Sequence, residues 1–436
     1  MNAGGTEDPA LASRAAVLDL LDAVLHRKRP LDDAFAAHAG IARLASRDRA
    51  FARNLTAATL RHLGQVDHAV GQCLEKPLPR NAMAVRDILR MGAAQLLFLQ
   101  TPPHAAADTA VSLTRTRGFA GFAKLVNAVM RRLGREGRTM AGDPDGPRMN
   151  TPDWLWESWT SAYGGDTARA IAAAHMVEAP LDITVKEDVP AWAERLNGIL
   201  LATGSLRLAA PGPVTELDGF NDGAWWVQDA AAALPAKLLG DVRDKTVIDL
   251  CAAPGGKAAQ LASSGARVTA VDRSGARLKR LHENMTRLSL TVETVTADAA
   301  QWKPAAPVDA VLLDAPCSAT GTIRRHPEVA RLKTRRDITK LADLQDRLLE
   351  AAAVMIRPGG TLVYCVCSLE PEEGPERIRT FLDTHSGMKR TPLLAEEVGG
   401  LEQLINADGD LRTLPCHLAD LGGLDGFYAA RLRRRP

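Results

Sequence analysis

The stretch 249–262, DLCAAPGGKAAQLA, has the pattern of a strand followed by a glycine turn and a helix. It starts at the end of a short β-branched run, KTVIDL, and passes through two adjacent glycines into a helical pattern. Two glycines after a proline permit a tight turn and a close approach to a ligand, and the amides of the first helical turn face the same crevice. The spacing differs from the G-x-G-x-x-G of dinucleotide enzymes, and a Walker loop needs Ser or Thr after Gly-Lys. We therefore expect a compact adenosine-type ligand.

Four more β-branched runs follow, separated by helical stretches: ARVTAVD, LTVETVTAD, VDAVLLDAP and TLVYCVC. This alternation predicts an α/β domain, a Rossmann-like, doubly wound and mainly parallel sheet whose ligands sit beyond the carboxyl ends of the strands. Asp272 and Asp298 end the second and third runs. There we expect Asp272 to bind the ribose hydroxyls and Asp298 to lie within reach of the adenine. One Asp at a strand end is equally well explained as a helix cap, but acidic residues in register behind a Gly-rich loop favour a ligand.

The N-terminal part of the chain is helical and basic. In RAAVLDLLDAVL, apolar residues recur at helical spacing, which predicts an all-α domain over residues 1–138. This segment has 20 Lys and Arg against 12 Asp and Glu, with clusters such as SRDRAFARN, LTRTRG and VMRRLGREGR. Such clusters attract phosphates, although a solvated helix face would explain them equally well.

A polar, Gly- and Pro-rich stretch, GREGRTMAGDPDGPRMN, follows and is typical of a linker. Residues 139–225 are acidic, with 5 Lys and Arg against 13 Asp and Glu. We expect this segment to contain the linker and a small α+β subdomain, and residues 226–436 to form the catalytic α/β domain. The role of the middle segment does not follow from its sequence.

Composition narrows the class of protein. A chain of 436 residues exceeds what one hydrophobic core serves, so two or three domains are expected. No apolar stretch approaches the roughly 18 residues of a membrane span, and the first residues lack the pattern of a signal peptide. Six cysteines without regular spacing do not form a disulfide framework. We expect a cytoplasmic protein that has no metal site and no membrane partner.

The sequence VYCVCSLEPEEG, from Val363, places two cysteines around one valine. A reactive thiolate, half of a metal site and two small core residues are the alternatives, and the metal site lacks a second Cys or His pair. Cys365 lies two residues deeper along the expected strand than Cys367, so Cys367 is the accessible one. If the fourth and fifth strands are neighbours, Cys317 overhangs the same crevice.

Four motifs resemble one enzyme family. CAAPGGK, DAPCSATGTIRRHPEV, YCVCSLEPEEG and DGFYAARL, in this order, resemble the RNA cytosine-carbon-5 methyltransferases of the Nop/Sun group. The start, with RDRAFARNLTAATLRHLG and PPHAAADTAV, resembles the NusB-like domain of the RsmB branch, which methylates small-subunit rRNA. The likeness spans nearly the whole chain.

The resemblance implies a mechanism and a site. Carbon 5 of cytosine is a poor nucleophile, so a thiolate first adds to carbon 6 and the methyl group then comes from S-adenosylmethionine. The resemblance implies that Cys367 is the nucleophile, that Cys317 assists release, and that Asp314 binds the base edge. The cofactor site implied is Cys251, Ala252, Ala253, Pro254, Gly255, Gly256, Lys257, Asp272, Asp298 and Asp314. Two positions depart from the family, in which Thr is common: Val366 and Ala258.

The partner expected is RNA. Seven Lys or Arg fall within Arg324–Lys340, directly after Cys317, where they would hold phosphates around a presented base. A target base must be unstacked to reach a thiolate, which favours a loop substrate. Small-subunit rRNA and a monomeric enzyme are the prediction; a methyltransferase acting on tRNA or another RNA, and a non-catalytic RNA-binding assembly factor, are the alternatives.

Overall fold

The computed structural model describes residues 9–141, 145–209 and 212–436. The chain divides into two compact units. The first, called the helical unit below, consists of Met1–Val177 and Ile323–Lys333, and the second, the sheet unit, of Glu178–Thr322 and Thr334–Pro436. Among the described residues, no helix combines the length and the apolarity that a membrane crossing requires.

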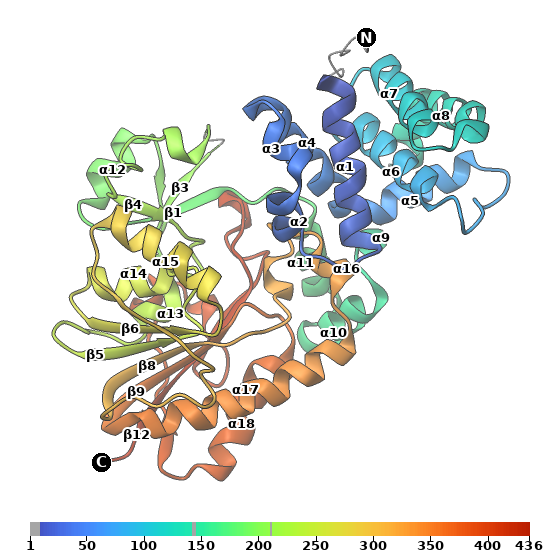
Figure 1. The fold of residues 1–436 in the computed structure, drawn as a ribbon. Coiled ribbons are helices and arrows are strands. Elements are labelled where there is room, and N and C mark those ends of the chain that lie inside the picture. The colour runs from blue at the N-terminus through green and yellow to red at the C-terminus, as the bar shows by residue number, and fades with distance from the viewer. Residues whose placement is uncertain (1–8, 142–144, 210–211) are drawn as a thin grey trace. The chain divides into compact units, whose positions relative to one another are not determined.

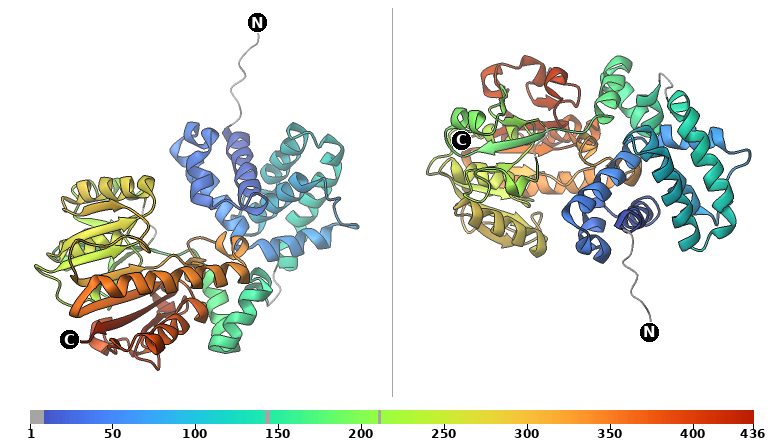
Figure 2. Two further views of the ribbon diagram at one scale, coloured as in Figure 1. Left: turned by 60° about the horizontal axis from the view of Figure 1, so that its bottom comes forward. Right: turned by 90° about the horizontal axis from the view of Figure 1, so that it is seen from above.

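The helices of the first part of the helical unit (Figure 2, in blue) pack around one apolar core, whose buried residues lie between Ala16 and Leu133. In α1, the fully buried Val17, Leu21 and Val24 recur at helical spacing, so the amphipathic pattern of the sequence is the packing face. The α-helices of the unit are α1 (Pro9–Leu25), α2 (Leu31–Ala37), α3 (Ala39–Arg43), α4 (Ser46–Arg61), α5 (Leu63–Cys73), α6 (Met83–Leu97), α7 (Pro103–Thr116), α8 (Ala123–Ala141), α9 (Gly146–Asn150), α10 (Asp153–Tyr163), α11 (Gly165–His175) and α16 (Val329–Leu332).

The stretch that resembled a linker is mostly helical. Helix α8 continues to Ala141, and α9 begins at Gly146; residues 142–144 lie outside the described residues. Gly137, which counted toward the linker signal, faces the core so closely that a Cβ there would lie 2.9 Å from Leu97. The glycine therefore serves a close helix contact within α8 rather than a break in the chain.

A small antiparallel sheet opens the sheet unit. Its strand order is β2-β3-β1-β4, and its core contains Ile183, Leu206 and Trp225. The elements are β1 (Leu181–Val185), α12 (Val189–Arg195), β2 (Ile199–Leu200), β3 (Leu206–Leu208) and β4 (Trp225–Val227). The segment predicted to hold the linker and the small α+β subdomain, 139–225, is thus divided, because its part up to Val177 belongs to the helical unit.

The main sheet confirms the predicted α/β fold. Its order is β10-β12-β9-β8-β5-β6-β7, with β11 paired to β12, and the contacts among β5 to β9 are all parallel. The five predicted strands correspond to β5 to β9. The strands are β5 (Thr246–Leu250), β6 (Arg267–Asp272), β7 (Glu293–Thr296), β8 (Val308–Asp314), β9 (Ile356–Val366), β10 (Met388–Arg390), β11 (Leu411–Thr413) and β12 (Phe427–Arg434).

Helices cover both faces of this sheet (Figure 1). Val247 and Leu312 point to one face with α13 (Leu234–Lys237), α14 (Gly256–Ser263) and α15 (Gly275–Leu288). Ile248 and Val311 point to the other, with α17 (Arg335–Met355) and α18 (Pro375–Thr384). Because strands buried on both faces leave only their ends accessible, the carboxyl ends of β5, β6, β8 and β9 are the places for chemistry.

Candidate active site

The glycine loop after β5 has a geometry that excludes side chains. Gly255 has φ of 106°, and a Cβ at this position would lie 2.7 Å from Leu281 of α15. The helix α14 starts at the next residue, Gly256, so its first amides point out of the loop. The loop is therefore shaped for a close approach between the main chain and a ligand.

A cavity of about 280 Å³ lies against this loop. Of the predicted site residues, those that line it are Ala252, Pro254, Gly255, Gly256, Lys257 and Asp314. Trp226 of β4, Gln228 directly after that strand and Asn284 of α15 are among the other residues of its wall. The other predicted cofactor residues, Cys251, Ala253, Asp272 and Asp298, are not part of the lining. The cavity thus joins the glycine loop to the end of β8.

Asp272 is buried behind the loop and is fully engaged. Its carboxylate accepts hydrogen bonds from the backbone N–H of Ser274 at 2.9 Å and of Ala253 at 3.3 Å. It also forms an ion pair with Arg277 at 3.1 Å. Through these contacts Asp272 holds the glycine loop against the start of α15.

Asp298, in contrast, is exposed beyond β7. Its Oδ1 accepts a hydrogen bond from the backbone N–H of Ala300 at 3.0 Å, which is the geometry of a capped turn. The capping role that the sequence left open is therefore present, and the side chain also remains accessible from solvent.

Asp314, at the end of β8, pairs with the buried Lys257 of α14. The Lys257 Nζ atom lies 2.8 Å from Asp314 Oδ2 and 5.1 Å from the centre of the Phe427 ring. Burial disfavours the charged amine, but the neighbouring Asp314 carboxylate outweighs it and raises the pKa of Lys257 above its ordinary value. The pair fixes Asp314 at the mouth of the cavity.

Asp249 is a buried acid that was not among the site residues predicted from the sequence. It lies on β5, fully buried, two residues before Cys251. Burial, and next the charge of Asp314, raise the pKa of Asp249 to about 8. Its position inside the motif DLCAAPGGK was visible in the sequence, but its environment was not.

The cysteines of β8 and β9 meet at the carboxyl end of the sheet. Asp314 is paired in register with Cys365, and the Cys317 and Cys367 Sγ atoms are 3.5 Å apart. Cys365 is completely buried and donates to Asp314 Oδ1 at 3.5 Å, whereas Cys367 follows the last residue of β9 and is partly exposed. This order of depth is the one expected from the strand pattern.

The thiols differ in their surroundings. The contact with Cys367, together with burial, raises the pKa of Cys317 well above its ordinary value. Burial raises the pKa of Cys365 in the same direction, and the pKa of Cys251 to about 12. These three residues keep their protons at neutral pH. Among the described residues, no group of three or more His, Cys, Asp or Glu side chains could hold a metal ion.

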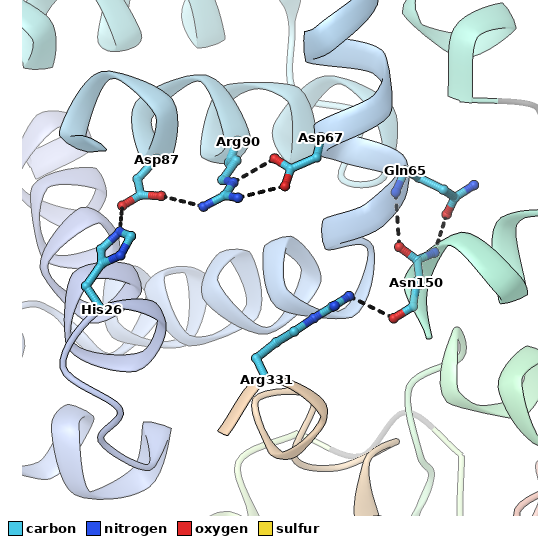
Figure 3. A network of polar contacts seen from close by, with 7 residues as sticks. All are labelled: His26, Gln65, Asp67, Asp87, Arg90, Asn150 and Arg331. Carbon is cyan, nitrogen blue, oxygen red and sulfur yellow. Dashed lines mark hydrogen bonds and ion pairs between the residues drawn. The ribbon is translucent and has the colours of Figure 1, made fainter. Parts of the chain in front are cut away.

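The basic segment after Cys317 is only partly available for phosphates. Arg324 is buried in the helical unit, where its carbonyl accepts a hydrogen bond from Arg61 at 3.0 Å. Arg331 donates to the Asn150 carbonyl at 2.8 Å, beside the contacts between Asn150 and Gln65 (Figure 3). The exposed basic residues of this stretch include Arg335, Arg336 and Lys340.

A chain of ion pairs around the buried Arg90 also orders the helical unit. Arg90 donates to both carboxylate oxygens of Asp67 at 2.7 Å and to Asp87 at 3.0 Å, and Asp87 contacts His26 at 2.7 Å (Figure 3). Arg90 therefore belongs to the interior, where Asp67 and Asp87 offset its charge, and it is not among the basic residues available to a partner.

Comparisons with known proteins agree with this architecture. The family described as 16S rRNA methyltransferase RsmB/F matches residues 236–433, and the NusB family matches residues 11–135. Ribosomal RNA small subunit methyltransferase B of Shewanella oneidensis is 33% identical over 400 residues, covering 88% of this chain and 91% of that protein. The protein of the same name from Xanthomonas campestris pv. campestris is 38% identical over 414 residues, covering 91% and 93%.

A solved structure is similar over most of the chain. The crystal structure of a methyltransferase homologue from Pyrococcus horikoshii superposes with a TM-score of 0.53 at 26% identity, covering 70% of this chain and 98% of that one. A NusB-like helical region followed by a Rossmann-like methyltransferase domain is thus the architecture of this chain.

Proposed function

Because the chain belongs to the family of ribosomal RNA small subunit methyltransferase B, we propose that it methylates carbon 5 of a cytosine in small-subunit rRNA, with S-adenosylmethionine as the methyl donor. The reaction proceeds through a covalent bond between Cys367 and carbon 6 of the base. The names of the relatives support the rRNA substrate. The arrangement of the cysteines supports the chemistry.

The observation that carries the proposal is the 3.5 Å separation between the Cys317 and Cys367 Sγ atoms, beside Asp314. Attack at carbon 6 and release of the product are separate steps on one base, so each needs a group at the same place. Cys367 is partly exposed past the end of its strand and is suited to attack. Release requires a base that takes the carbon-5 proton while the bond between carbon 6 and sulfur breaks. Cys317, whose raised pKa favours the protonated thiol, is suited to donate a proton to the departing Cys367 thiolate.

Asp314 is the group that we assign to the base edge. Its carboxylate borders the cavity and is about one-third exposed, while Lys257 and Cys365 hold it from the protein side. Addition of the thiolate at carbon 6 moves electron density into the ring, and a carboxyl group compensates for it by donating a proton to the base edge. Lys257 holds this carboxyl group in place.

The residues around the glycine loop fit an adenosine-type sulfonium cofactor. We assign Cys251, Ala252, Ala253, Pro254, Gly255, Gly256 and Lys257 to its binding, with Asp272 at the ribose and Asp298 at the adenine. The lack of side chains at Gly255 and Gly256 and the adjoining cavity support this assignment. When bound, S-adenosylmethionine supplies the methyl group. The carboxyl group of Asp314, which borders the cavity, favours its positive charge.

Bisulfite sequencing of total RNA from a strain that lacks the gene tests the substrate. We expect one cytosine of small-subunit rRNA to lose its protection from conversion, and complementation with Cys365→Ala, but not with Cys367→Ala, to restore it. Loss of protection in tRNA alone would replace the rRNA assignment by the tRNA alternative. Unchanged protection everywhere would favour a non-catalytic assembly factor.

A further inference from the structure

One buried carboxylate, Glu373, lies between the two cysteine segments. It is fully buried in the short turn that follows β9. Its Oε1 accepts a hydrogen bond from the backbone N–H of Ser318 at 2.9 Å, and its Oε2 accepts one from Ser368 Oγ at 2.6 Å. Ser318 directly follows Cys317, and Ser368 directly follows Cys367. A single side chain therefore bonds to both segments.

Further donors complete the shell around this carboxylate. The hydroxyl of Ser318 also donates to Oε2, and Gln345 of α17 donates to Oε1 at 3.2 Å. The Tyr364 hydroxyl donates to the Glu373 carbonyl at 2.6 Å, which fixes the turn itself. Burial raises the pKa of Glu373, and the hydrogen bonds from Ser318 and Ser368 oppose this shift. A carboxylate that accepts this many hydrogen bonds acts as a polar anchor rather than as a packing residue.

The two segments are also joined without Glu373. The backbone N–H of Gly321 donates to the Cys367 carbonyl at 3.0 Å, and that of Leu369 donates to Thr320 Oγ1 at 3.0 Å. Removing the carboxylate thus leaves the segments connected and changes how they are aligned.

We propose that Glu373 is a positioning residue that sets the separation of the Cys317 and Cys367 thiols. The consequence for turnover rests on the proposed function: Cys317 assists release only if it lies beside the base that Cys367 holds. Glu373 bonds to Ser318 through two groups and to Ser368 through one. Its loss therefore displaces Cys317 more than Cys367, and slows release more than attack.

Thiol cross-linking in the full-length protein tests the positioning directly and needs no substrate. Diamide, a diazene oxidant, takes one hydrogen atom from each of two neighbouring thiols and leaves a disulfide. Peptide mapping then measures the rate at which Cys317 and Cys367 are joined. We expect Glu373→Gln to slow this rate by about tenfold or more, since small displacements have large effects on reactions between held groups. Ser318→Ala, which removes one donor, is expected to slow it less.

Asp410→Asn is the matched control. Asp410 is also a buried carboxylate of the sheet unit, but it accepts hydrogen bonds from Tyr428 and Arg390 rather than from a cysteine segment. Circular dichroism identifies a temperature at which all variants are folded, and the rates are compared there. Cross-linking in Glu373→Gln at the wild-type rate, or an equal slowing in Asp410→Asn, would overturn the proposal.

Turnover provides a second readout. We expect Glu373→Gln to lower kcat with little change in KM for RNA, and to accumulate part of the covalent protein–RNA species. If no variant forms that species while Glu373→Gln still slows cross-linking, the proposed function fails and the positioning role stands. A lowered kcat without any extra covalent species, in a protein whose Cys317→Ala form does accumulate it, would contradict the assignment of Glu373 to release.

Discussion

The substitution Asp249→Asn tests the electrostatics of the site quantitatively. Asp249 is fully buried, and neither of its carboxylate oxygens has a hydrogen-bond partner among the described residues. Burial first, and then the Asp314 carboxylate, raise its pKa to about 8, while Lys257 acts in the opposite direction. In the unfolded chain the pKa of an Asp is about 3.9. Between these two values the folded chain holds a proton that the unfolded chain has released.

The sign and size of the effect follow from this difference. A raised carboxyl pKa favours folding at low pH, and this contribution is lost as the pH rises toward the folded value. One proton released on unfolding lowers the unfolding free energy by about 1.4 kcal/mol for each pH unit, or roughly 2.7 kcal/mol between pH 5 and 7 as an upper limit. An Asn at position 249 carries no such proton. The difference in unfolding free energy between Asp249→Asn and wild type should therefore shift in favour of the variant by up to this amount between pH 5 and 7.

Urea unfolding at pH 5, 6 and 7 measures this gain. Asp309→Asn is the control, because a backbone hydrogen bond from Thr246, together with Arg357, lowers the pKa of Asp309 to about 2. The stabilisation that Asp309 provides is lost only as the pH falls toward its lowered pKa. The difference in unfolding free energy between Asp309→Asn and wild type should therefore stay constant between pH 5 and 7. Parallel profiles of wild type and Asp249→Asn would show that Asp249 is ionised in the folded chain, and would refute the reasoning.

Three further outcomes follow from the site and the two units. Asp272→Ala should weaken S-adenosylmethionine binding by about 1.5–3 kcal/mol in calorimetry, since a charge-assisted hydrogen bond is removed; unchanged affinity would leave Asp272 only its role in holding the loop. Lys124→Gln with Arg131→Gln, on the exposed face of α8, should weaken RNA binding and flatten its salt dependence, by roughly 0.7–0.9 in the logarithmic slope for each phosphate that is no longer neutralised; an unchanged slope would mark that face as solvated only. Asp182→Ala should cost about 3–5 kcal/mol in thermal unfolding, because it strands the buried Arg207 that donates to both Asp182 oxygens at 2.7 Å; a decrease well below this would show that the pair adds little.

Local sequence patterns were sufficient for the elements of the sheet. The runs from KTVIDL to TLVYCVC became β5 to β9 because they are short, β-branched and separated by amphipathic helices. The relative depth of Cys365 and Cys367 also followed, since it depends only on their spacing along one strand. In contrast, the prediction of a linker at Gly137 was wrong. This glycine allows a close contact with Leu97, a residue 40 positions away in the chain.

The supporting residues of the site depend on such distant contacts. Glu373 was visible only as one acid in SLEPEEG, and nothing local shows that it bonds to Ser318, 55 positions earlier. Likewise, Arg324 belonged to a basic run that suggested phosphate binding, but its burial depends on helices at the start of the chain. Motif residues are thus predictable from the sequence, whereas the residues that hold them in place require the fold.

The central claim, a covalent Cys367–cytosine intermediate that Cys317 resolves, is tested most directly by trapping. Cys317→Ala is incubated with labelled small-subunit rRNA and S-adenosylmethionine, and the products are separated under denaturing conditions. We expect a denaturant-resistant protein–RNA band that disappears when Cys367→Ala is added to the same chain. A band that persists in the double variant, or full turnover by Cys317→Ala without any band, would contradict it.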